Sequence, residues 1–109
     1  QMANTFKLKT KKNVGVTTAP LYVVPSSTTT VVIGITASNI SGNNINVGIG
    51  ITRAAADDVH LMKNIPIPQG SSFEFMQGNK IVLETTDTIT AKSDVNNSLD
   101  VALTIMEIT

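Results

Sequence analysis

His60 is the only histidine in this 109-residue chain and the side chain best suited to acid–base catalysis near neutral pH. A serine nucleophile needs such a base within hydrogen-bonding reach, together with a third group that orients the imidazole. His60 lies between Val59 and Leu61 in an alternating segment, so we expect it on the solvent face of a strand. Nothing in the sequence places a serine and an aspartate beside it. We therefore predict no catalytic residues and no enzymatic activity.

Two other patterns resemble binding motifs but lack residues that the motifs require. Residues 94–99 are rich in Asp and Asn, yet Leu99 stands where a calcium loop needs Gly and Ile105 where it needs a bidentate Glu. Gly48 and Gly50 are followed by no helix, so they do not form a phosphate-binding loop. Because the chain also has no cysteine for a thiolate site, we expect neither a metal nor another cofactor.

The amino-acid composition narrows the classes of partner. The formal net charge is zero, which gives no indication of nucleic-acid binding. No apolar run approaches the roughly 20 residues that span a bilayer, and no signal peptide is visible, so we expect no membrane partner. The lack of cysteine favours assembly in a reducing cytoplasm. With no Trp and one Tyr, the chain offers little aromatic surface on which a sugar could stack.

The elements that must position these residues are strands. β-Branched residues alternate with smaller or more polar ones over residues 31–37 and again over residues 45–51, which is typical of strands with one buried face. Residues 39–44 between them supply Asn, Ser and Gly, the residue types of turns. We interpret residues 28–51 as a long antiparallel hairpin around which the rest of the chain is organised.

Shorter strand and turn signals recur along the whole chain, with no convincing helix between them. Eight or nine strands at this spacing predict an all-β protein, an antiparallel β-sandwich of about eight strands with an immunoglobulin-like or a jelly-roll arrangement. Residues 14–109 are long enough for a single domain with one core. The alternation predicts that this core contains Ile33, Ile35, Val47, Ile49, Phe73, Leu83, Ile89, Val101 and Leu103.

Residues 1–13 form a basic segment before that domain, of which Gln1, preceding Met2, is set aside as a cloning remnant. The segment is either a solvated edge strand, whose lysines discourage pairing with other sheets, or an arm that docks on a neighbouring subunit. All eight acidic residues lie after residue 56, so a second copy of the chain would offer them to such an arm. A homo-oligomer would then use contacts from Phe6, Lys7, Leu8, Lys9, Lys11 and Lys12.

Three further segments follow one another between residues 20 and 109. The first is Tyr22-Val23-Val24-Pro25-Ser26-Ser27-Thr28-Thr29, at the start of a long strand, and the second is the turn Asn39-Ile40-Ser41-Gly42. The third runs through Ile67-Pro68-Gln69-Gly70, Lys80-Ile81-Val82-Leu83-Glu84, Asp87-Thr88-Ile89 and Met106-Glu107-Ile108-Thr109. In this order and spacing they resemble small structural proteins of tailed bacteriophages, including phages of marine cyanobacteria. Family members often have Ala-Gly before the Asp, where this chain has Thr85-Thr86.

The resemblance implies a component of the virion, present in many symmetric copies and assembled in the host cytoplasm. A head (capsid) decoration protein, a neck protein and a tail protein all agree with it, and their partners are other virion proteins. The family brings no catalytic residues. An alternative of a different class is a receptor- or glycan-binding attachment module of a phage tail, which would bind a host surface instead of building the particle.

Overall fold

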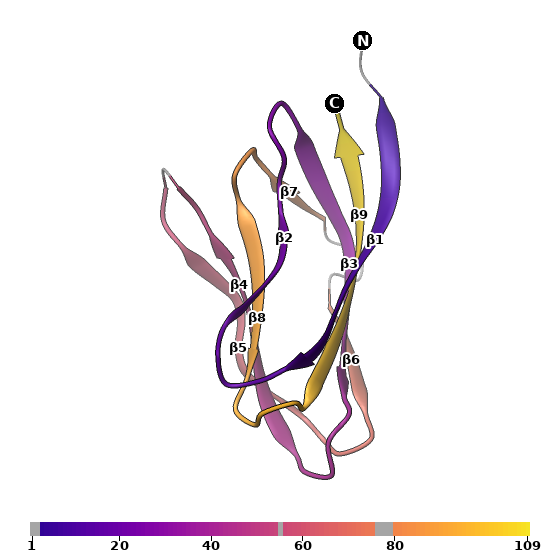
Figure 1. Ribbon diagram of the computed structural model, residues 1–109, viewed down its shortest axis with the longest axis vertical. Coiled ribbons are helices and arrows are strands. Elements are labelled where there is room, and N and C mark those ends of the chain that lie inside the picture. The colour runs from indigo at the N-terminus through magenta and orange to yellow at the C-terminus, as the bar shows by residue number, and fades with distance from the viewer. Residues whose placement is uncertain (1–2, 55, 76–79) are drawn as a thin grey trace.

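The computed structural model describes residues 3–54, 56–75 and 80–109. Within these residues the chain forms nine strands in two antiparallel sheets that face each other, so the protein is an all-β sandwich (Figure 1). Sheet A has the order β1-β9-β3-β6, with β7 also paired to β3, and sheet B has the order β2-β8-β4-β5. The strands are β1 (Asn4–Val14), β2 (Ala19–Val23), β3 (Thr29–Asn39), β4 (Ile45–Thr52), β5 (Val59–Ile67), β6 (Ser72–Phe75), β7 (Ile81–Leu83), β8 (Thr88–Ser93) and β9 (Leu99–Ile108).

The connectivity separates the two sandwich arrangements that the sequence left open. β1 pairs with β9, β2 with β8, β3 with β6 and β7, and β4 with β5. The first strand thus pairs with the last, the second with the next to last, and so on inward, as in a long hairpin that has been rolled up. A jelly roll has eight strand positions, and β6 and β7 together occupy one of them beside β3. The described strands therefore have the jelly-roll arrangement, and the predicted antiparallel sandwich of about eight strands is confirmed.

Residues 28–51 do not form a hairpin, so that prediction is wrong. β3 belongs to sheet A and β4 to sheet B, and the turn between them carries the chain across the core. Buried Asn39 holds this crossing: its amide donates to the carbonyls of Asn43 (2.7 Å) and Ile67 (3.0 Å), and its Oδ1 accepts from the Ser41 N–H (2.9 Å). Two strands with one buried face each show the same alternation whether they lie side by side or face to face.

The core fills the space between the inner faces of the two sheets. Seven of the nine predicted core residues are buried there, which confirms most of the face assignment, and the two exceptions are Ile33 and Phe73. The seven are Ile35, Val47, Ile49, Leu83, Ile89, Val101 and Leu103.

The two exceptions have different causes. The register between β3 and β9 shifts between Val32 and Gly34, so a β-bulge at Ile33 brings both Val32 and Ile35 to the core and leaves Ile33 half-buried. Phe73 is 37% exposed because β6 is an edge strand, and its ring stacks on that of Phe75 with centroids 6.5 Å apart.

The N-terminal strand is joined to the C-terminal strand along one edge of sheet A. The Ala3 N–H donates to the Thr109 carbonyl and the Thr109 N–H to the Ala3 carbonyl, each at 3.0 Å. Figure 1 shows the start of β1 and the end of β9 side by side at one end of a molecule whose principal extents are 48 × 25 × 22 Å. The register runs on from these bonds through Lys11, so β1 is part of the sandwich.

Candidate assembly surface

The six contact residues predicted in the N-terminal segment lie on β1, where alternation divides them between two faces. Lys7 is opposite Ile105 and Lys9 is opposite Leu103, both of which are buried in the core, so these lysines share the inner face of sheet A. Phe6 and Leu8 consequently lie on the outer face. There the strand exposes its apolar side chains to solvent and turns its lysines inward.

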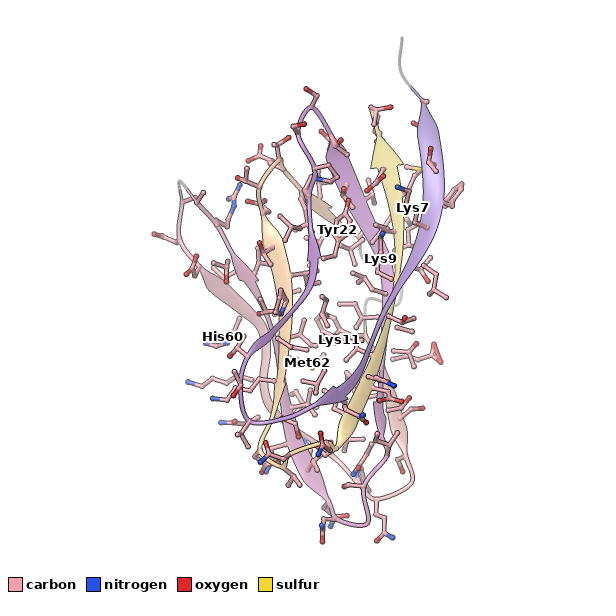
Figure 2. The ribbon with its side chains drawn as sticks, viewed as in Figure 1. Lys7, Lys9, Lys11, Tyr22, His60 and Met62 are labelled. Atoms are coloured by element: carbon pink, nitrogen blue, oxygen red, sulfur yellow. The ribbon has the colours of Figure 1, made fainter. Side chains whose placement is uncertain are left out.

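The inward lysines meet a polar cluster at the margin of the core (Figure 2). Buried Glu107 accepts from the Lys7 ammonium at 2.8 Å and from the Tyr22 hydroxyl at 2.5 Å. The Tyr22 hydroxyl also lies 2.8 Å from the Thr30 hydroxyl, and the Lys9 ammonium is 5.9 Å from the centre of the Tyr22 ring. The cluster thus joins β1, β2, β3 and β9, and every member has a polar or aromatic partner.

The electrostatics of this cluster suit an ion pair that fixes strands. The hydrogen bond from Lys7, followed by that from Tyr22, lowers the pKa of Glu107, so the carboxylate stays charged. Burial, together with the hydrogen bond to Glu107, raises the pKa of Tyr22 to about 12. A phenol that serves as a base or nucleophile needs the opposite shift. The geometry therefore supports a structural contact between the two sheets at this point.

We expect the substitution Tyr22→Phe to lower the free energy of unfolding by about 1–3 kcal/mol at pH 9, since it removes a hydrogen bond to a buried carboxylate. The raised pKa makes this contribution complete below pH 10.0, the ordinary value, and progressively lost as the pH rises towards about 12. Urea unfolding of the original protein and of the Tyr22→Phe variant at pH 9 and pH 11 measures this contribution. The two proteins share all other titrating groups, so only Tyr22 can change the difference between them. An equal difference at both pH values would contradict the assignment.

The outer face of sheet A carries an exposed apolar row that crosses the sheet. Phe6 on β1 is opposite Met106 on β9, Met106 is opposite Val31 on β3, and Val31 is opposite Val82 on β7. Phe6 is 69% exposed and Val82 is 61% exposed, while the two central side chains are half-buried by their neighbours. Leu8, 64% exposed, begins the next row. Such a patch on an outer face is typical of a protein–protein contact.

Lys11 and Lys12 lie at the other end of β1, away from this row. Both are exposed and line a hollow of about 660 Å³, together with Thr36 and Asp100. The Asp100 carboxylate accepts from the Asn13 N–H at 2.9 Å, which fixes the strand beside its bulge. Lys11 is opposite Val101, which is buried in the core, so it shares the inner face of sheet A with Lys7 and Lys9. The structure therefore separates the predicted contacts into an outer apolar pair, three inward lysines and Lys12 beside the bulge.

The outer face of sheet B has a different character. A hollow of about 650 Å³ lies over Gly48, where a side chain would meet only ordinary van der Waals contacts, and it is bordered by His60, Lys63, Lys92 and Asp94. Figure 2 shows His60 on the outer side of β5. Hydrogen bonds from the Asn46 backbone N–H (2.9 Å) and amide (3.1 Å) fix Asp94 and lower its pKa. This face is polar and charged, in contrast to sheet A.

Sequence reasoning missed a second ion-pair cluster, at the sandwich end that joins β4 to the turn before β8. The Arg53 Nε lies 3.0 Å from Asp87 and its Nη2 lies 2.5 Å from Glu84. Buried Asp87 also accepts the Glu84 N–H at 2.9 Å, and the Arg53 N–H donates to Asp58 at 2.7 Å. The hydrogen bond to Asp87 raises the pKa of Arg53. Arg53 is the only arginine of the chain, and the planar guanidinium group of arginine suits binding to two carboxylates. This residue type was the feature of the sequence from which the cluster could have been predicted.

Two negative findings apply to the described residues alone. No three His, Cys, Asp or Glu side chains among them are grouped so as to hold a metal ion. The same residues contain no helix of the length and apolarity that crossing a membrane requires.

The comparisons with known proteins bear on the fold. No family model matches the chain, and no curated protein matches its sequence. Among solved structures, the chain is similar to a subunit of Bacillus endospore appendages, which are described as a family of disulfide-linked pili. The TM-score is 0.58 at 14% sequence identity, over 98% of this chain and 86% of the other. At this identity the likeness concerns the fold.

Proposed function

We propose that this protein is a structural subunit that assembles with copies of itself and other subunits into a larger particle, without catalysis. The observation that carries the proposal is the exposed apolar row of Phe6, Met106, Val31 and Val82 on an outer face of a complete sandwich. Its side chains are not needed to close the core, which lies on the other side of sheet A. They gain a partner only if another molecule covers them.

The similar fold of the appendage subunit supports the proposal, because that protein forms pili. Those pili are disulfide-linked, whereas this chain contains no cysteine. Copies of this protein would therefore be held by apolar burial, hydrogen bonds and ion pairs. Such contacts form and dissociate reversibly, so the number of copies in the particle has to stabilise it.

The finer proposal is a component of a tailed-phage virion, namely a head decoration, neck or tail protein assembled in the host cytoplasm. It rests on the resemblance of the three segments between residues 20 and 109. The buried side chain of Asn39 gives one of those segments a physical role, since it organises the crossing from β3 to β4. Its partners would be the other proteins of the virion.

Quantitative mass spectrometry of purified virions, with the copy number of this protein, tests the finer proposal. Hundreds of copies per particle would assign it to the head or tail tube, and a dozen or fewer to a neck or baseplate. Absence from virions, together with presence in a cell-surface appendage, would overturn the phage assignment and keep the structural role. Binding of the isolated protein to a glycan array would instead favour the attachment module.

A further inference from the structure

The uncharged part of the outer face of sheet A is broad enough to form an interface. Two further rows lie beside the apolar row. In the first, Leu8 is opposite Thr104 and Thr104 is opposite Gly34. In the second, Thr10 is opposite Ala102. With strands about 4.8 Å apart and rows about 7 Å apart, four strands and these three rows cover roughly 400 Å². A standard interface buries about 800 Å² on each partner, so this area supplies a substantial share.

Two opposite charges on this face, Lys12 and Glu74, lie at the end away from the apolar row. Lys12 is on β1, at one edge of the sheet, and Glu74 is on β6, at the opposite edge. Glu74 is opposite Thr36 on β3, Thr36 is opposite Ala102 on β9, and Ala102 is opposite Thr10 on β1. Lys12 is two residues after Thr10, so Glu74 and Lys12 lie at nearly the same height along the strands. Both side chains are exposed, and neither has an ion-pair partner within the described residues.

We propose that two copies of this chain pack face to face through the outer faces of their sheets A, related by a twofold axis that runs along the strands between β9 and β3. This rotation exchanges the two edges of the sheet and keeps its two ends in place. Phe6 of each copy then faces Val82 of the other, and Lys12 of each copy approaches Glu74 of the other. The apolar row and the ion pair are both formed twice, as an isologous contact requires.

Two other arrangements are disfavoured by the charges. A twofold axis across the strands would exchange the ends, and it would place Lys12 and Glu74 against the row of Phe6 and not against each other. Packing of sheet A on sheet B of the next copy would place that row over the hollow bordered by Lys63, Lys92 and Asp94. Both arrangements remove charged groups from water without pairing them, which costs free energy.

Gly34 adds an independent observation at the centre of the face. A side chain there would meet nothing within 4 Å in its own subunit, and the backbone is not in the left-handed region that favours glycine. The isolated fold therefore tolerates other residues at this position. In the proposed dimer Gly34 faces β9 of the second copy, where the absence of a side chain lets two sheets approach closely.

This dimer rests on the proposed function, because it specifies one contact by which copies of the chain would assemble. Sedimentation equilibrium on the full chain over a wide concentration range tests it, and we expect a monomer–dimer equilibrium. Lys12→Glu and Glu74→Lys should each raise the dissociation constant roughly tenfold, because each replaces two attractive pairs by repulsive ones. The double variant Lys12→Glu/Glu74→Lys should restore the original value. Gly34→Arg should raise the constant by at least about a hundredfold.

The control is Lys63→Glu, the same charge reversal on the outer face of sheet B, which should leave the dissociation constant unchanged. Circular dichroism melting of each variant checks that folding is preserved, as the exposed lysines and Glu74 and the open space at Gly34 lead us to expect. A monomer at all concentrations would overturn the dimer while leaving the copy number in virions as a separate test of the proposed function. An oligomer that Gly34→Arg and both charge reversals leave intact would show that copies associate through another face.

Discussion

Replacing Ile35 with Ala is expected to lower the free energy of unfolding by about 2–5 kcal/mol, whereas the same replacement at Ile33 should cost about 1 kcal/mol or less. Ile35 is 1% exposed in the centre of the core, so its truncation loses burial and leaves a cavity. Ile33 is the bulge residue of the same strand and is only half-buried. Simple alternation would place the two residues on one face and predict equal costs.

Urea unfolding of the two variants and the original protein, with the slope of the transition compared, measures these costs. The substitutions are chemically identical and two positions apart, so differences in strand propensity largely cancel. A second core position, Leu103→Ala, should match Ile35→Ala, since Leu103 is fully buried opposite Ile35. A cost at Ile33 equal to that at Ile35 would mean that the bulge does not exist as described.

The strands could be predicted from sequence because each has its own period, and the core residues follow from it. The alternation does not predict which other strand each strand pairs with. The segments before and after Asn39 bury one face each, and that is equally true of a hairpin and of a crossing between sheets. The difference lies in the long-range pairing of β3 with β9 and of β4 with β8, which joins residues 36 to 79 positions apart in the chain.

The candidate surface illustrates the same limit at the level of single residues. The alternation of Phe6 and Leu8 with lysines predicts two faces for the segment, and apolar residues are expected on the inner one. The structure turns the lysines inward because Glu107 and Tyr22, far away in sequence, supply a carboxylate and a ring there. A β-bulge after Lys11 then restores the usual phase, so Val14 is buried. Neither partner can be identified from the spacing within the segment.

The pair of Lys7 and Glu107 should be the strongest single polar contact of β1. We expect Lys7→Met to lower the free energy of unfolding by about 1–3 kcal/mol at pH 7, because it leaves a buried carboxylate without its cation. This is less than for a fully buried pair, since the Lys7 side chain is 42% exposed and water partly replaces it. The double variant Lys7→Met/Glu107→Gln should cost less than the sum of the two single variants, by about 0.5–3 kcal/mol.

The pH dependence separates this ion pair from mere packing of the lysine stem. Lys7 is the largest cause of the lowered pKa of Glu107, so the folded protein binds fewer protons than the unfolded chain below pH 4.5, the ordinary value. The stabilisation is therefore complete above pH 4.5 and is lost as the pH falls through the depressed pKa of the folded state. Asp94, whose pKa is also lowered, contributes the same trend to both proteins and cancels in the comparison. Urea unfolding from pH 7 to pH 3 should show the cost of Lys7→Met shrinking below pH 4.5. A cost that stays constant over this range would assign the effect of Lys7 to its apolar stem.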